Sequence, residues 1–192
     1  RARGDNRFIP AEGGHSHAVE LCRQVEEFND GRMLNGKEHE SLGKRFTFGV
    51  AGYPEKHEEA MNLDIDIEYL KAKIDAGAQY VVTQMFFDNS VFYNFLYRIR
   101  EKGITVPVLP GIMPVTNGKQ IARSCQLSGA VLPARFRAIV DKFGDNPKAM
   151  QQAGIAYATD QIIDLIANGI HNIHVYSMNK PEVAAAIMSN LS

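Results

Sequence analysis

The 192-residue sequence contains only two cysteines, Cys22 and Cys125, which lie far apart in the chain. Neither belongs to a C-x-x-C pair, so the sequence predicts neither a zinc site nor a redox-active cysteine pair. Histidine pairs such as His15-x-His17 lack a third suitably placed ligand, and we therefore expect no metal. The scarcity of cysteine is typical of a reducing cytoplasm, which is where we expect the protein to act.

Excess charge and long apolar runs are also missing. The net charge is −1, and no polybasic run occurs, which argues against nucleic acid or a membrane surface as a partner. No apolar stretch approaches the length of a bilayer span, and no signal-peptide pattern opens the chain. With 45% hydrophobic and 22% charged residues, the composition predicts a soluble globular protein, most simply of one domain.

The most informative segment is 80–88, an apolar β-branched run that ends in an amide, two aromatic rings and a carboxylate. The run Tyr-Val-Val-Thr at 80–83 is typical of a strand covered on both faces, as in parallel sheets. Gly77 stands where a helix ends in a left-handed residue, and 90–102 has a helical pattern. Gln84 therefore ends a parallel strand, where α/β folds bind ligands, and it is a candidate for binding a flat polar molecule. The alternative is that Gln84 merely caps the strand.

Further segments repeat this order of strand, loop and helix. Strands are predicted at 45–52, at 105–114 and within 172–180, where the strand runs into a polar loop. Helices are predicted at 16–29, 64–76, 132–143, 147–168 and 181–191. The chain begins without methionine, and its first residues look like the end of a strand that closes at Asp5, so we expect further chain before them. Segment 30–45 is polar, contains glycine and predicts a surface loop or a short insertion.

The repeated units predict an α/β fold with a parallel sheet. The alternation alone allows either an open doubly wound sheet or a (β/α)8 barrel, because both use right-handed parallel crossovers. No GxGxxG or Walker sequence follows any strand, which disfavours a Rossmann-type nucleotide site.

Polar residues follow the strands at several places. Tyr53 and His57 lie in the loop after 45–52 and offer an aromatic ring and an imidazole. Asp66 and Lys73 lie two turns apart on nearly one side of the next helix, so both could reach one extended ligand. The simpler alternative for these two residues is a solvated charged face. Gln120 falls in the first turns of the helix after 105–114. It places a second amide at the same mouth as Gln84, the mouth being the opening at the carboxyl ends of the strands.

Six motifs, in this order, resemble the methylenetetrahydrofolate reductase family. They are Arg3-Gly-Asp5, Ala51-Gly-Tyr-Pro-Glu-Lys-His57, Asp75-Ala-Gly-Ala78, Thr83-Gln-Met-Phe-Phe-Asp88, Leu109-Pro-Gly-Ile-Met-Pro114 and His174-Val-Tyr-Ser-Met-Asn-Lys180. The resemblance spans nearly the whole chain and implies a (β/α)8 barrel of the TIM type that carries FAD at the carboxyl ends of its strands. Residues 1–192 resemble the last four to five strand-helix units, the carboxyl-terminal part of a single barrel domain. The first half, with its glutamate general acid, has no counterpart here.

The resemblance also implies roles for individual residues. Asp5 matches a catalytic aspartate beside the flavin N1 and C2 carbonyl, where its charge would disfavour the anionic reduced flavin and favour the cationic iminium form of the substrate. The positions that match FAD contacts are Arg3, Gly4, Asp5, His17, Ala18, Tyr53, His57, Asp66 and Lys73. The positions that match folate contacts are Gln84, Gln120, Tyr176 and Lys180. Tyr69, Ala72 and Ser124 depart from the pattern of some members, which affects local affinity more than chemistry.

The implied activity is the reduction of 5,10-methylenetetrahydrofolate to 5-methyltetrahydrofolate, in which NAD(P)H reduces FAD and leaves before the folate takes the hydride. We therefore expect a cytoplasmic flavoprotein of one-carbon metabolism and methionine synthesis, and a homo-oligomer. Residues 1–192 alone should be inactive. One alternative is a non-catalytic half-barrel module, for binding or structure. Another is a barrel enzyme for a phosphorylated metabolite, although the expected glycine-rich phosphate loop is missing.

Overall fold

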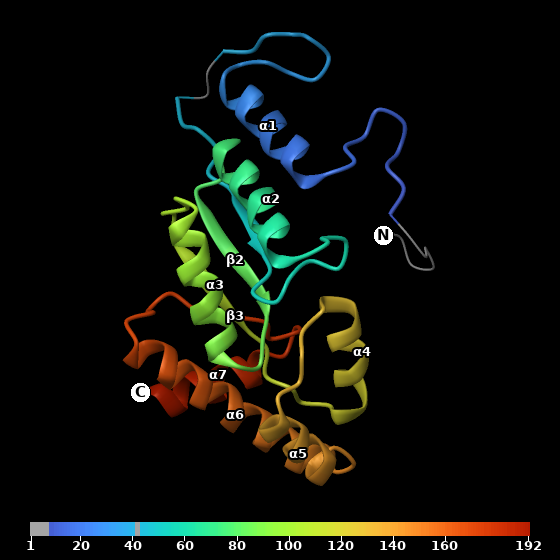
Figure 1. Ribbon diagram of the computed structural model, residues 1–192, viewed down its shortest axis with the longest axis vertical. Helices are drawn as coiled ribbons and strands as arrows, with labels where there is room; N and C mark the ends of the chain where they lie inside the picture. Colours follow the sequence, from blue (N-terminus) through green and yellow to red (C-terminus); the bar gives the residue numbers. More distant parts are fainter. Residues whose placement is uncertain (1–7, 41–42) are drawn as a thin grey trace.

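The computed structural model describes residues 8–40 and 43–192, which form one parallel sheet and a set of helices (Figure 1). Arg3, Gly4 and Asp5 lie outside the described residues. The elements in chain order are α1 (Ala18–Asn29), β1 (Gly49–Gly52), α2 (Leu63–Asp75), β2 (Tyr80–Met85), α3 (Asn89–Glu101), β3 (Val108–Ile112), α4 (Gly118–Ser128), α5 (Ala134–Phe143), α6 (Pro147–Ala167), β4 (His174–Val175) and α7 (Pro181–Leu191).

The four strands are parallel and lie in the order β1-β2-β3-β4. Each strand therefore pairs with its neighbours in the sequence, as in a barrel, whereas an open doubly wound sheet reverses its order at a switch point. The observed order is the one expected for consecutive strands of a barrel. The chain has the α/β fold of a TIM-type barrel segment, as the resemblance implied.

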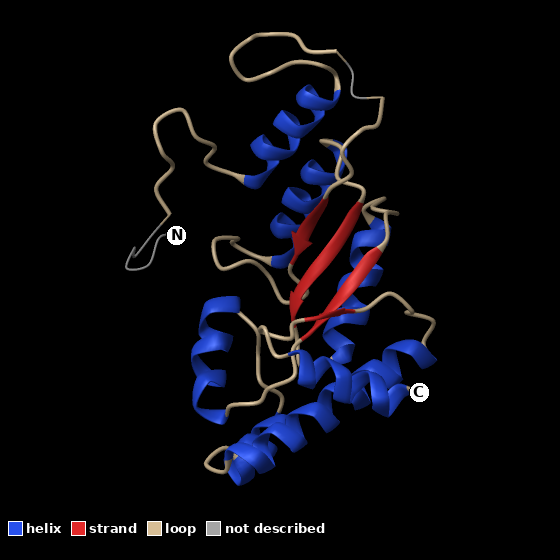
Figure 2. Cartoon of the chain, turned by 180° about the vertical axis from the view of Figure 1, so that it is seen from behind, coloured by secondary structure: helices blue, strands red, loops and turns tan. Residues whose placement is uncertain are grey.

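Helices cover one face of the sheet. Val81 is completely buried and packs in one cluster with Leu70 of α2 and Phe95 of α3. The alternate residues of β2 are more open, and Tyr80 is 37% exposed. In Figure 2 the strands stand in front of α3, so that the open face is toward the reader. The prediction that 80–83 is covered on both faces is wrong, because the described strands do not close around an interior.

The helix bounds agree with the predicted ranges to within two residues, whereas every strand predicted at 45–52, 105–114 and 172–180 is shorter than expected. The fourth strand contains only His174 and Val175. Helix ends follow local caps such as Gly77, whose φ is 105°, while a strand extends only as far as its neighbour pairs with it. None of the described helices is long and apolar enough to cross a membrane.

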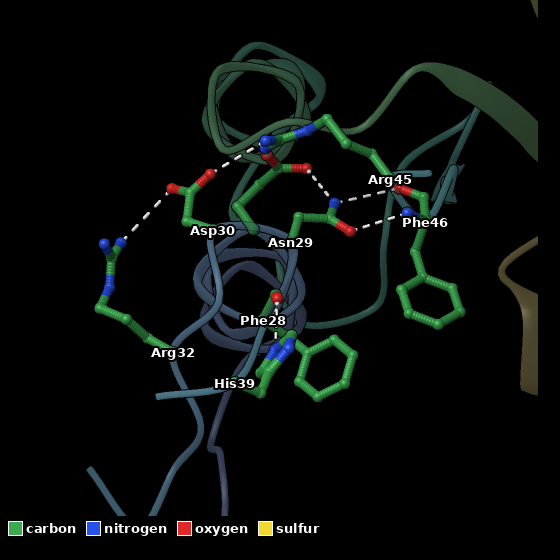
Figure 3. Close-up of polar contacts among 8 residues, drawn as sticks. Phe28, Asn29, Asp30, Arg32, His39, Arg45 and Phe46 are labelled. Atoms are coloured by element: carbon green, nitrogen blue, oxygen red, sulfur yellow. Dashed lines mark hydrogen bonds and ion pairs between the residues drawn. The ribbon is translucent and has the colours of Figure 1, made fainter. Parts of the chain in front are cut away.

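Between α1 and β1, the described residues 30–40 and 43–48 form a surface loop, as predicted, and polar contacts attach residues 45 and 46 to the end of α1 (Figure 3). Arg45 forms ion pairs with Asp30, at 2.9 Å, and with Glu26. The N–H of Phe46 donates to Asn29 Oδ1 at 2.7 Å, and Asn29 Nδ2 donates to the Phe46 carbonyl oxygen at 3.1 Å. These contacts fix the loop to α1 rather than to the carboxyl ends of the strands.

Candidate active site

The loop after β1 and the side of α2 form a first polar cluster. The rings of Tyr53 and His57 meet edge to face, with centroids 4.6 Å apart. The main-chain N–H of His57 donates to Asp66 Oδ2 at 2.8 Å, and Asp66 is only 8% exposed. Asp66 therefore holds the loop that carries the two rings, and it does not belong to a solvated charged face.

Lys73 reaches from α2 to the carboxyl end of β1. Its Nζ donates to the carbonyl oxygen of Ala51 at 2.7 Å. Burial lowers the pKa of Lys73, while Asp66 and the buried Cys22 of α1 act in the opposite direction. A half-buried ammonium with one main-chain partner keeps donors available, so Lys73 could bind a phosphate or another anion. Asp66 thus lies near Lys73, whereas the contact of both residues with one extended ligand stays a prediction.

Gln84 is the penultimate residue of β2 and is half-buried. Its Oε1 accepts from the N–H of Met85 at 2.9 Å, which leaves its Nε2 without a recorded partner among residues 8–40 and 43–192. The hydroxyl of Tyr176 donates to the carbonyl oxygen of Thr83 at 2.8 Å. Because Tyr176 follows β4 and Thr83 lies in β2, this bond spans β3 and brings Tyr176 beside Gln84.

The two remaining substrate candidates lie on the other side of the mouth. Lys180 Nζ donates to Thr116 Oγ1 at 2.8 Å, which joins the segment after β4 to the segment after β3. Gln120 is exposed in the first turn of α4, where Asn117 caps the helix by accepting from the N–H of Lys119 at 2.9 Å. Lys180 therefore contacts the segment that leads directly into the helix carrying Gln120.

The electrostatic environment of Tyr53 involves both the β1–α2 cluster and Tyr176. Burial raises the pKa of Tyr53, and the charges of Asp66 and Tyr176 raise it further. The two groups also lie on neighbouring strands, because Gly52 of β1 pairs with Thr83 of β2, whose carbonyl oxygen binds the Tyr176 hydroxyl. The predicted cofactor and substrate positions that the structure describes after β1, β2 and β4 face one mouth, at the carboxyl ends of the strands.

His17 and Ala18 lie at the exposed start of α1. This helix runs alongside α2, because a Cβ atom on Gly77 would lie 2.5 Å from Cγ of Glu26 and because Cys22 interacts with Lys73. The start of α1 therefore lies toward the same end of the sheet as the start of α2. No contact between His17 or Ala18 and the other candidate residues is recorded within the described part of the chain.

The sequence analysis missed several residues that shape the mouth. Glu55, whose pKa burial raises, accepts from the N–H of Val131 at 2.7 Å and connects the loop after β1 to the segment between α4 and α5. Thr83 and Thr116 accept from main-chain and side-chain donors that lie far away in the sequence. For Thr83 the sequence offered one local signal, a hydroxyl next to the candidate amide of Gln84. Across residues 8–40 and 43–192, no group of three His, Cys, Asp or Glu side chains could hold a metal ion.

Comparison with known proteins identifies the family to which a chain with these residues belongs. The family model for methylenetetrahydrofolate reductase matches residues 1–192. The chain belongs to the methylenetetrahydrofolate reductase family. This membership confirms the resemblance that the six motifs indicated.

Sequence identity to individual members of the methylenetetrahydrofolate reductase family agrees with the family match. The chain is 33% identical over 197 residues to methylenetetrahydrofolate reductase (NADH) 1 of Arabidopsis thaliana, which covers 98% of this chain and 31% of that protein. It is 32% identical over 191 residues to the 5,10-methylenetetrahydrofolate reductase of Pectobacterium carotovorum subsp. carotovorum, which covers 98% of this chain and 58% of that protein. The chain thus spans less than two thirds of either relative.

A solved structure shares the fold. It is an uncharacterized protein from Clostridium thermocellum that binds two copies of 5-methyl-5,6,7,8-tetrahydrofolic acid, with a TM-score of 0.58 and 16% sequence identity. The match covers 98% of this chain and 63% of that structure. At this identity the likeness concerns the fold alone.

Proposed function

We propose that this chain supplies cofactor- and folate-binding parts of a flavin-dependent methylenetetrahydrofolate reductase, which converts 5,10-methylenetetrahydrofolate to 5-methyltetrahydrofolate with FAD and NAD(P)H. The observation that carries the proposal is that the Lys73 cluster and the bond from Tyr176 to Thr83, next to Gln84, lie at the same end of a barrel-type sheet. Family membership supports the reaction. The relative in Arabidopsis thaliana is named as an NADH enzyme and the relative in Caenorhabditis elegans as a probable NADPH enzyme, so the proposal includes both nucleotides.

The β1–α2 cluster fits an FAD. A flavin dinucleotide has a diphosphate and flat rings, and here a half-buried ammonium lies near an edge-to-face pair of rings. Lys73 would bind an anionic part of the cofactor, while Asp66 would hold the loop so that Tyr53 and His57 keep their orientation. The bound cofactor would supply hydride transfer, and the protein its position and electrostatic environment. Asp5, outside the described residues, is proposed to tune the flavin through its negative charge.

The Gln84 side fits the folate. An amide can donate and accept along the edge of a pterin, and the Nε2 of Gln84 has no recorded partner among the described residues. The ring of Tyr176 would lie beside the bound pterin. Gln120 and Lys180 would contact other parts of the substrate, and the ammonium of Lys180 suits a carboxylate.

The test is Gln84→Leu in the full-length protein. We expect 5-methyltetrahydrofolate to bind roughly 5 to 150 times more weakly, because an unpaired buried partner costs about 1–3 kcal/mol. The FAD content should not change. Gln152→Leu, an exposed glutamine of α6, is the matched control and should leave both quantities unchanged.

Two results would contradict the proposal. Loss of FAD with unchanged folate affinity would assign Gln84 to the cofactor site. A wild-type protein that is colourless and binds no folate would favour the non-catalytic module instead.

A further inference from the structure

We propose that Thr83 and Gly111 are positioning residues which, together with the hydroxyl of Tyr176, hold the peptide group of Gln84 and thereby set the direction of its amide. This inference rests on the proposed function of Gln84 and extends it to two residues that contact no ligand themselves. It also changes the part that Tyr176 can play.

The pairing of β2 with β3 is irregular at Thr83. Val82 pairs with Leu109, but the next pair joins Met85 to Gly111, so β2 contains one extra residue between the two pairs. At this point the N–H of Gly111 donates to Oγ1 of Thr83 at 2.8 Å. Thr83 is 0% exposed, so its hydroxyl replaces a main-chain acceptor of the ladder in a buried place. Bulges of this kind bend a strand and redirect side chains beside active sites.

The carbonyl group of Thr83 takes its hydrogen bond from elsewhere. Because the N–H of Gly111 is bound to the Thr83 side chain, the Thr83 carbonyl oxygen needs another donor, and it accepts from the Tyr176 hydroxyl at 2.8 Å. This carbonyl belongs to the peptide unit whose nitrogen is that of Gln84. A hydroxyl that arrives from beyond β4 therefore fixes the peptide plane from which the Gln84 side chain extends.

Gly111 provides the space for this contact. A Cβ atom at position 111 would lie 2.3 Å from the Thr83 carbonyl oxygen and 2.6 Å from Cε2 of the Tyr176 ring. Both separations are far below van der Waals contact, so any side chain at 111 would displace the ring or spread the strands. The absence of a side chain at 111 is thus the condition under which Tyr176 reaches Thr83.

The arrangement restricts what Tyr176 can offer a substrate. A phenol has one proton to donate, and this proton is already directed at the Thr83 carbonyl oxygen. Tyr176 can therefore present a ligand with its ring and with the lone pairs of its oxygen, but not with a hydrogen-bond donor. Its hydroxyl acts on the substrate through Gln84.

The experiment compares two tyrosines in the full-length protein. Tyr176→Phe removes the bond to the Thr83 carbonyl, and the control Tyr157→Phe removes a similar buried bond of 2.6 Å to the Phe87 carbonyl, three residues beyond Gln84. Tyr176→Phe should weaken 5-methyltetrahydrofolate binding roughly tenfold, as expected for one buried carbonyl left unpaired, and it should speed amide hydrogen exchange at residues 83–85. Tyr157→Phe should lower the midpoint of thermal unfolding but leave folate affinity within about twofold.

A second pair of variants tests Thr83. Thr83→Val removes the hydroxyl and should behave like Tyr176→Phe, whereas Thr83→Ser keeps the hydroxyl and should restore both folate affinity and slow exchange. Equal loss of folate affinity in Tyr176→Phe and Tyr157→Phe would overturn the inference, because the effect would then be one of general stability. Unchanged exchange at 83–85 in Tyr176→Phe and Thr83→Val would overturn it too.

The exchange measurement needs no ligand, so it separates the inference from the proposed function. A wild-type protein that binds no folate would refute the proposed function, and with it the effect on substrate. The exchange rates would still show whether Thr83 and Tyr176 hold the peptide group of Gln84.

Discussion

Single residues at the mouth are held mainly by main-chain groups. Asp66 accepts from the N–H of His57, Lys73 donates to the carbonyl of Ala51, and Tyr176 donates to that of Thr83. Main-chain partners fix the position of these side chains independently of any ligand. A site built in this way is largely preorganised, which lowers the cost of binding.

Lys73 carries the clearest conflict between stability and binding. Burial depresses its folded-state pKa below the ordinary 10.5, so its charged form destabilises the fold at neutral pH. The stability associated with the neutral amine is present above the unfolded-state pKa and is lost as the pH falls through the folded-state pKa. We therefore expect Lys73→Met to unfold at an equal or higher temperature than the wild type at pH 7. This difference in unfolding temperature should shrink as the pH approaches the pKa of the lysine amine in the unfolded chain.

The same variant should bind FAD roughly tenfold more weakly, because it lacks the cation for the cofactor. Thermal unfolding at several pH values and flavin absorbance of the purified full-length protein measure the two effects. Lys71→Met, which removes an exposed pair with Asp75, should change neither by much. Full FAD retention by Lys73→Met, combined with lower stability, would show that Lys73 is structural.

At the scale of elements, a polar network joins helix α3 to helix α6. Asn89 Nδ2 and the Tyr93 hydroxyl each donate to Asp164 Oδ2 at 2.7 Å. Asn89 also donates to the main-chain carbonyl of Gln161 at 2.9 Å. Since α3 follows the strand of Gln84 and α6 leads toward β4, the network fixes the two helices that flank the segment after β2.

The network predicts a defined pH dependence. Hydrogen bonds from Asn89 and Tyr93 lower the pKa of Asp164 from 3.8, so the stability they contribute is present above this value and is lost as the pH falls through the folded-state pKa. Burial first, and then Asp164, raise the pKa of Tyr93 from 10.0 to about 12, so the phenol donor is lost only as the pH rises through that range. The network should contribute fully between about pH 4 and pH 10.

We expect Asp164→Ala to lower the unfolding midpoint by roughly 2–4 °C near neutral pH, as for a loss of about 1 kcal/mol in a chain of this size. The difference from wild type should vanish in acid, which a series of thermal scans would measure. Asp160→Ala, a change in the same helix as Asp164, breaks the exposed pair of Asp160 with Arg135 of α5 and should have a smaller effect. A difference that persists unchanged well below pH 4 would contradict the assignment to the Asp164 carboxylate.

The whole molecule presents an open sheet. The face that bears Tyr80, Val82 and Gln84 is only partly covered, and among the described strands β1 and β4 have no outer neighbour. Unpaired edges and an exposed apolar face favour association with another chain. A closed barrel would remove both features.

Residues 1–192 expressed alone should therefore self-associate with increasing concentration, retain little FAD and show no reductase activity. Sedimentation measures the first property, and flavin absorbance and turnover measure the others. Val82→Lys places a charge on the open face and should reduce association, whereas Tyr97→Lys, on the exposed side of α3, should not. A yellow, active, monodisperse monomer would refute this prediction.

Local signals in the sequence determined much of the fold. Gly77 marks a helix end, as predicted, and Asn117 and Pro181 mark the starts of α4 and α7 within the few residues that they contact. The six motifs together were sufficient to indicate the family, which the match over residues 1–192 confirms. The positions of Gln84, Asp66 and Lys73 along their elements followed from periodicity alone.

Only the tertiary structure decided the strand order, the single covered face of β2 and the bulge at Thr83. The partner of the Thr83 carbonyl lies 93 residues away in the sequence, and no local preference specifies it. Propensity and capping act over a few residues, whereas register and hydrogen-bond partners depend on how distant segments pack and on which backbone groups this packing leaves unpaired. For this reason the sequence indicated which side chains face the mouth, while the structure determined what holds them there.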